Sequence, residues 1–217
     1  IRVTFRSCMI LSLALLAIAS PVNAQTSPPK NIVLFIVDDL GWQDTEVPFG
    51  PETTPFNRQY RTPAMSRLAQ RGMLFTDAYA ASCVCTPTRV SIMTGQNPAR
   101  HHITNWILRK GKDQSARHPV LRSPAGWNTN GLSDASVTLP RLLQGTGYHT
   151  IHVGKAHWGA IGTTGSDPCK LGFDVKIAGH AAGAPASYYG RHNFSESIRR
   201  NRPVKPSVWD VPHLEAY

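Results

Sequence analysis

The sequence contains few cysteines and few acidic side chains, and after residue 20 it has no long apolar run. It has 4 cysteines in 217 residues, and only 13 acidic side chains against 23 basic ones. No apolar stretch after residue 20 is long enough to span a bilayer, which excludes a transmembrane helix there. No internal repeat is visible. What remains is a basic chain of net charge +10, long enough for one domain with a hydrophobic core and suited to anionic partners.

Residues 1–24 are predicted to be a secretory signal peptide. Arg2 and Arg6 make the start basic, residues 9–20 form an apolar run, and small side chains stand at Val22 and Ala24. This segment is too short and too early for a membrane anchor, and we expect cleavage after Ala24. Residues 25–217 are then the mature chain, secreted or periplasmic and without a membrane anchor.

The order of apolar segments predicts an α/β fold. Residues 31–37 are continuously apolar and rich in β-branched side chains, the pattern of a central strand buried on both faces. Further strands are expected at 73–79, 148–153 and 173–177, and helices at 62–71 and from Thr138 to near Gly145. This alternation indicates βαβ units in a mostly parallel central sheet flanked by helices. The long irregular stretches 41–61 and 97–137 are expected to be functional loops.

Residues 83–95, Cys-Val-Cys-Thr-Pro-Thr-Arg-Val-Ser-Ile-Met-Thr-Gly, place a nucleophile at the start of a helix. The hydroxyl of Thr86 is predicted to cap this helix, and Pro87 suits its first position. Cys85 then stands at the positive end of the helix dipole, and Arg89 adds a positive charge about one turn later. The segment is a predicted anion site with a modifiable thiol. Outside the signal peptide the number of cysteines is odd, so at least one thiol is left unpaired or modified.

Two carboxylates, Asp38 and Asp39, follow directly on the strand predicted at 31–37. Ligands of open α/β sheets collect beyond the carboxyl ends of the strands. Paired carboxylates at that place suit a hard cation, Ca²⁺ or Mg²⁺, rather than zinc. Asp44 is close in sequence but is not predicted to be a ligand.

Residues 154–159, Gly-Lys-Ala-His-Trp-Gly, follow the strand predicted at 148–153. Lys155 and His157 are two residues apart, so an extended backbone directs both side chains to one face. Together they are suited to neutralise a bound anion and to transfer a proton near neutral pH. The neighbouring histidines are interpreted as structural: His149 and His152 in or beside the strand, and His101 and His102 in a loop.

These segments together resemble the signature of the type I sulfatases of the alkaline phosphatase superfamily. The shared motifs are Cys-x-Pro-x-Arg at 85–89 with Thr-Gly at 94–95, Asp-Asp-Leu-Gly-Trp at 38–42, Gly-Lys-x-His at 154–157 and Gly-Phe-Asp at 172–174. The resemblance covers Asn31 to Asp174, and we expect it to continue to Tyr217. It implies the α/β fold of that family and the hydrolysis of sulfate esters, by an arylsulfatase or a sulfatase of sulfated glycans.

The resemblance implies a role for each motif. Cys85, and not Cys83, has the proline and arginine at the family's spacing, which makes it the residue oxidised to formylglycine, whose hydrate is the nucleophile. Asp38 and Asp39 are then calcium ligands together with residue 85. Arg89 stabilises the charge on the sulfate group.

Lys155 and His157 are, by the same resemblance, catalytic residues that also bind the sulfate. Many members have Trp between them, where this chain has Ala156, and that difference concerns the shape of the substrate more than the chemistry. With residue 85 modified, Cys83 and Cys169 are expected to pair with each other or to stay buried.

The resemblance also implies partners and a second half-site. The partners are a sulfate ester substrate, with a sulfated carbohydrate as one candidate, and a formylglycine-generating enzyme; nucleic acid is not expected. The family uses a later Asp-Asn pair on the calcium and a further His and Lys at the sulfate, but no Asp-Asn dipeptide follows Lys155. We therefore expect residues 25–217 to be an incomplete N-terminal part of the catalytic domain, inactive by itself.

Three other functions fit some of these observations. A phosphonate or phosphodiester hydrolase of the same superfamily would use the same modified cysteine. A noncatalytic protein that binds sulfated glycans through its basic surface would need no aldehyde at residue 85. A nucleic-acid binder fits least, because the basic residues are scattered except at 199–205, which we interpret as an exposed loop broken by proline.

Overall fold

The computed structural model of the chain describes residues 30–121, 123–124 and 126–184. It consists of two units, Ile1–Phe35 and Ile36–Tyr217, and the packing and the site described below belong to the second. The predicted signal peptide and the basic run at 199–205 lie outside the described residues. Within the described ranges, no helix has the length and apolarity that a bilayer span requires.

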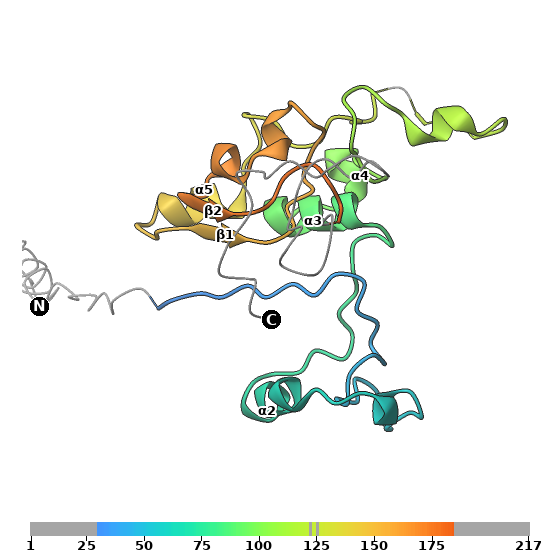
Figure 1. The fold of residues 1–217 in the computed structure, drawn as a ribbon, viewed down its shortest axis with the longest axis vertical. Coiled ribbons are helices and arrows are strands. Elements are labelled where there is room, and N and C mark those ends of the chain that lie inside the picture. The colour runs from blue at the N-terminus through green and yellow to red at the C-terminus, as the bar shows by residue number, and fades with distance from the viewer. Residues whose placement is uncertain (1–29, 122, 125, 185–217) are drawn as a thin grey trace, which may run out of the picture. The chain divides into compact units, whose positions relative to one another are not determined.

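In the described residues of this unit, short helices and one small sheet make up the regular structure (Figure 1). In chain order the elements are η1 (Asn57–Gln59), α2 (Pro63–Arg71), α3 (Cys85–Thr94), α4 (Pro98–His101), η2 (Gln114–Arg117), α5 (Leu139–Gln144), β1 (Ile151–Val153), η3 (Thr164–Ser166), η4 (Pro168–Leu171) and β2 (Val175–Ile177). The predicted helices at 62–71 and 138–145 are confirmed as α2 and α5, each with a proline in its first turn.

The sheet consists of β1 and β2, which pair in parallel with Ile151 opposite Val175 and Val153 opposite Ile177. This confirms the strands predicted at 148–153 and 173–177, each shortened to three residues. Asp174 holds the start of β1, because its carboxylate accepts hydrogen bonds from the backbone N–H and the hydroxyl of Thr150, at 2.7 and 3.0 Å. The Gly-Phe-Asp motif therefore has a structural role.

Two predicted strands are wrong. Residues 31–37 and 73–79 form no strand, and their apolar side chains are exposed, with Val33 at 86% and Met73 at 78%. A strand buried on both faces needs a ladder partner and covering layers. Among the described residues the only ladder between strands joins β1 to β2, so the apolar pattern of these two segments is not used in this structure.

The hydrophobic core lies where α3 packs against the chain that follows it. The stretch 97–137, predicted as a functional loop, supplies three of its buried side chains, and the segment after β1 supplies Trp158. A fully buried aliphatic side chain contributes about 1.5–3 kcal/mol to folding, so this long connection stabilises the unit. The core residues are Val90, Met93, Ile103, Ile107, Leu132, Ala156, Trp158, Ala160 and Leu171, with Phe173 packed against them.

One tight approach depends on glycine. Gly172 has φ 103°, and a Cβ at this position would lie 2.5 Å from Cγ and 2.7 Å from the backbone nitrogen of Arg141. Both the positive φ and the lack of space exclude a side chain there. The turn between η4 and β2 therefore requires the glycine of the Gly-Phe-Asp motif, which lets α5 contact the strand connection closely.

Candidate functional site

Helix α3 begins at Cys85 and carries the predicted nucleophile in its first turn. Its N-cap is Val84, which makes no side-chain cap bond, and the helix ends at Gly95 with φ 66°, a left-handed C-cap. The predicted cap role of Thr86 is wrong. Thr86 is the second residue of the helix and is fully buried. Its side chain therefore packs into the core, where the hydroxyl accepts a hydrogen bond from the Ile107 N–H at 3.2 Å.

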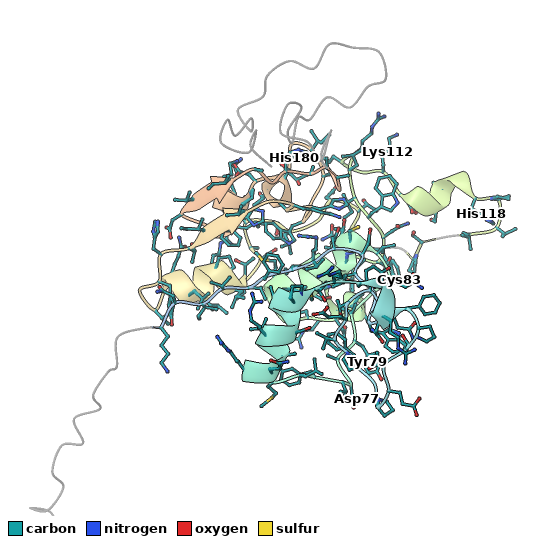
Figure 2. All side chains as sticks on the ribbon, turned by 60° about the horizontal axis from the view of Figure 1, so that its bottom comes forward. Asp77, Tyr79, Cys83, Lys112, His118 and His180 are labelled. Atoms are coloured by element: carbon teal, nitrogen blue, oxygen red, sulfur yellow. The ribbon has the colours of Figure 1, made fainter. Side chains whose placement is uncertain are left out.

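Of the cysteines in the described part, Cys85 is half-buried, and Cys83 and Cys169 are exposed and free. The expectation that these two pair or stay buried is therefore wrong. Figure 2 labels Cys83 on the same segment as the exposed residues Asp77 and Tyr79, which leads into α3. The helix start separates the two neighbouring thiols, since only Cys85 belongs to the first helical turn.

Asp38 and Asp39 approach Cys85 although they are consecutive in the chain. Side chains of neighbouring residues in an extended strand point to opposite faces. Asp39 instead adopts φ 57°, a left-handed conformation that Asp tolerates better than most residues. With this turn, the ligand atoms of Asp38, Asp39 and Cys85 all lie within 4.8 Å of one another.

This spacing fits a single calcium ion. Oxygen ligands stand about 2.3–2.6 Å from Ca²⁺, so two ligands of one ion are at most about 5 Å apart. The two carboxylates are hard donors of the kind that Ca²⁺ and Mg²⁺ require, whereas a thiol is a soft donor. The donor set therefore fits the ion when residue 85 presents an oxygen in place of its sulfur.

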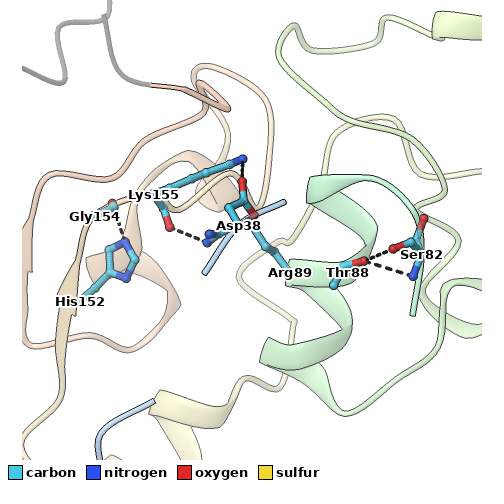
Figure 3. A network of polar contacts seen from close by, with 7 residues as sticks. All are labelled: Asp38, Ser82, Thr88, Arg89, His152, Gly154 and Lys155. Carbon is cyan, nitrogen blue, oxygen red and sulfur yellow. Dashed lines mark hydrogen bonds and ion pairs between the residues drawn. The ribbon is translucent and has the colours of Figure 1, made fainter. Parts of the chain in front are cut away.

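Arg89 connects the three motifs (Figure 3). Its side chain is only 7% exposed; its Nε lies 3.4 Å from the Asp38 carboxylate, and an Nη donates to the Lys155 backbone carbonyl at 2.6 Å. The Lys155 ammonium in turn forms an ion pair with the other oxygen of Asp38. The helix, the aspartate pair and the segment after β1 therefore meet at one carboxylate.

These two cations determine the ionisation of Asp38. Burial by itself would raise the pKa of Asp38, but the hydrogen bond from Lys155 and the charges of Arg89 and Lys155 outweigh it and lower the pKa. Asp38 is therefore ionised near neutral pH and available to a cation. Lys155 pairs with one carboxylate oxygen of Asp38, so it acts as a counter-ion to Asp38 in this structure.

His157 lies inside the protein and is 3% exposed. Its Nε2 lies 3.0 Å from the carbonyl oxygen of Ile107. Burial and the nearby Lys155 ammonium lower the pKa of His157 to about 4. The ring is therefore neutral near pH 7 and does not add the positive charge expected from the sequence. The predicted role of His157 in binding sulfate stays a prediction.

The remaining histidines have structural contacts. His152 is buried, bonds to the Gly154 carbonyl at 3.0 Å and packs against Trp158 and Phe173, which fits the interpretation made from the sequence. His101 was predicted to lie in a loop, and this prediction is wrong. It is the last residue of α4. Its Nε2 lies 3.0 Å from the Ser91 hydroxyl, so it fastens α4 to α3.

The two buried histidines predict a loss of stability in acid. Burial lowers the pKa of His152 to about 4, as it does that of His157, from an ordinary value of 6.5. The unfolded chain takes up these protons below pH 6.5 and the folded chain only near pH 4. Stability is therefore complete above pH 6.5 and falls as the pH drops towards 4, by roughly 3 kcal/mol per histidine.

Urea unfolding of His152→Gln between pH 7 and pH 4 tests this expectation. Glutamine keeps a donor for the Gly154 carbonyl but does not titrate, so about half of the acid-dependent loss should disappear. His118→Gln, which changes an exposed histidine, is the matched control and should keep the full slope. Equal slopes in the two variants would contradict the assignment.

Comparison with known proteins identifies the family. The family model described as Sulfatase matches residues 30–202, which include the aspartate pair, the cysteine motif and the Lys-His segment. The chain belongs to the sulfatase family. An α/β fold follows from this membership, and the small parallel sheet is consistent with it.

The curated relatives include sulfatases of two substrate classes. N-acetylgalactosamine-6-sulfatase from Sus scrofa is 34% identical over 89% of this chain and 32% of the relative. Steryl-sulfatase from Mus musculus is 35% identical over 72% of this chain and 23% of the relative. The solved structure of Ps i-CgsB is 27% identical, with a TM-score of 0.41, over 59% of this chain and 24% of that one. The chain thus spans about a third or less of the length of the relatives it matches.

Proposed function

We propose that this chain contributes the nucleophile and two calcium ligands to the active site of a sulfate ester hydrolase. The observation that carries the proposal is the meeting of Asp38, Asp39 and Cys85 within 4.8 Å, with Arg89 and Lys155 on the same carboxylate. Cations, a potential nucleophile and hard ligands in one place suit the transfer of a group with several anionic oxygens. Membership of the sulfatase family supports the sulfuryl group as that group.

The nucleophile in this proposal is formylglycine made from Cys85 by a formylglycine-generating enzyme. One hydroxyl of its hydrate attacks the sulfur, the bond from sulfur to the ester oxygen breaks, and the alcohol leaves with a proton. The second hydroxyl then loses its proton, the carbon–oxygen double bond forms again, and sulfate departs. Water restores the hydrate.

The side chains of the site have separate tasks in this scheme. Arg89 and Lys155 stabilise the charge on the sulfuryl oxygens, and His157 accepts the proton whose loss expels sulfate. Asp38 and Asp39 would hold the calcium together with residue 85. Calcium, when bound, supplies positive charge that makes the hydrate hydroxyl easier to deprotonate.

The substrate class follows from charge and relatives. The net charge of +10 favours a polymer with many anionic groups over an ester with a single sulfate group, and the relatives include a sulfatase named for a sulfated amino sugar. We therefore propose a sulfated carbohydrate as the substrate. The predicted signal peptide supports a secreted or periplasmic protein.

The proposal predicts an aldehyde at residue 85 when the chain is made together with a formylglycine-generating enzyme. Trypsin releases residues 72–89, which contain both Cys83 and Cys85. Fragmentation in the mass spectrometer should place the aldehyde at residue 85, and an aminooxy reagent should label it. Cys83→Ala should keep the aldehyde and Cys85→Ala should lose it.

The same experiment separates the hydrolase from a noncatalytic binder of sulfated glycans. Unmodified cysteine at residue 85, or an aldehyde at residue 83, would contradict the proposed nucleophile. Binding of a sulfated glycan that is unchanged in Cys85→Ala, without any aldehyde in the parent chain, would favour the noncatalytic function.

A further inference from the structure

The hydrogen bonds of His157 define which of its nitrogens carries the proton. A carbonyl oxygen can only accept, so the Nε2 that lies 3.0 Å from the Ile107 oxygen is a donor. Because burial keeps the ring neutral near pH 7, Nδ1 then has a lone pair and no proton. His157 is therefore an acceptor through Nδ1 alone.

That Nδ1 has no protein partner. It is buried, and within the described ranges it is the one buried side-chain nitrogen or oxygen without a hydrogen bond. A buried acceptor left in this way has lost its hydrogen bonds to water without replacing them, which is unfavourable. A Cβ at Gly183 would lie 2.7 Å from Cε1 and 2.9 Å from Nδ1, so only glycine at 183 lets the backbone pack this closely against this edge of the ring.

The carbonyl that orients His157 is itself held by the cysteine motif. Ile107 is buried in the core, and its N–H donates to the hydroxyl of Thr86 at 3.2 Å. Thr86 is fully buried and follows Cys85 in α3. A continuous chain of contacts therefore runs from Thr86 through the peptide groups of Ile107 to His157.

We propose that Thr86 is a positioning residue that, through Ile107, holds His157 in the tautomer protonated at Nε2, with Nδ1 as the proton acceptor of the site. The inference rests on the proposed function, in which His157 accepts the proton lost when sulfate is expelled. It gives the residue next to the nucleophile a task besides helix formation. It also makes Nδ1, rather than Nε2, the atom that takes the proton.

Nitrogen-15 NMR of the histidine-labelled chain at pH 7 tests the proposal, with His157→Gln to assign the signals. We expect a protonated Nε2 and an unprotonated Nδ1 in the parent chain. Thr86→Val keeps the shape but removes the acceptor for the Ile107 N–H, and should lose this single tautomer. Thr86→Ser, which restores the hydroxyl, should recover it.

Thr138→Val is the matched control. Thr138, like Thr86, is fully buried and its hydroxyl makes a hydrogen bond to the backbone, but here the hydroxyl donates to the carbonyl of Leu171. This variant should leave the signals of His157 unchanged. A protonated Nδ1 in the parent chain would overturn the proposal without any variant. So would an unchanged tautomer in Thr86→Val, or equal changes in Thr86→Val and Thr138→Val.

The outcome is independent of the aldehyde test. A chain without aldehyde at residue 85 that still shows the expected tautomers would refute the proposed hydrolase and leave the role of Thr86 in orienting His157 intact. An aldehyde together with the wrong tautomer would do the reverse.

Discussion

Asp39→Asn should weaken calcium binding by about 100-fold or more, because the loss of an outer-shell contact alone already costs about 10–100-fold and this change removes a charged ligand. Asn tolerates the left-handed φ of 57° at this position at least as well as Asp, so the substitution does not strain the backbone. Titration calorimetry with Ca²⁺ on the aldehyde-bearing chain measures the effect.

Asp38→Asn should have a similar effect on calcium but is less specific, because it also removes the partner of Arg89 and Lys155. Asp44→Asn is the matched control. The Asp44 carboxylate accepts hydrogen bonds from the Gly41 N–H at 2.8 Å and the Tyr60 hydroxyl at 3.1 Å and does not belong to the three-residue cluster. Equal losses of calcium affinity in Asp39→Asn and Asp44→Asn would show that general negative charge, rather than this cluster, attracts the ion.

Arg89→Met should lower the free energy of unfolding by about 3 kcal/mol. The guanidinium makes one bond to a carboxylate and one to the Lys155 carbonyl, and hydrogen bonds to charged groups contribute about 1.5–3 kcal/mol each. Methionine fills much of the same volume, so the loss reports the polar contacts more than a cavity. We reduce the sum because Asp38, which is 31% exposed, keeps its pair with Lys155.

Urea unfolding at pH 7 measures this loss, with Arg67→Met as the control. Arg67 is an exposed residue of α2, and surface substitutions of this kind change stability by about 0.5 kcal/mol or less. If Arg89→Met lowered the free energy of unfolding no more than Arg67→Met does, the contacts of Arg89 with Asp38 and Lys155 would not stabilise the unit. The role of Arg89 would then be limited to binding the sulfuryl group.

The sequence by itself determined the helices α2 and α5, the short strands β1 and β2, and the family of the chain. Proline in the first turn and glycine at the end place α2 between residues 63 and 71, because these residues act through their own backbone. The strands β1 and β2 were predictable from short apolar runs bounded by glycine. The motif residues could be recognised because each motif is a short run of residues whose types and spacing are typical of the family.

Only the tertiary structure decided which groups these residues contact. Arg89 reaches Asp38 across 51 residues and Lys155 across 66, and the partner of His157 is a backbone carbonyl, which no side-chain pattern can indicate. Thr86 looked like a helix cap because capping is the local use of a hydroxyl, but burial gave it the Ile107 N–H instead. The apolar run at 31–37 is a case in which the local pattern predicts an element that the folded chain does not form. Its pattern favours a strand, yet a strand forms only where a partner supplies hydrogen bonds, and partners are a property of the folded chain rather than of the segment.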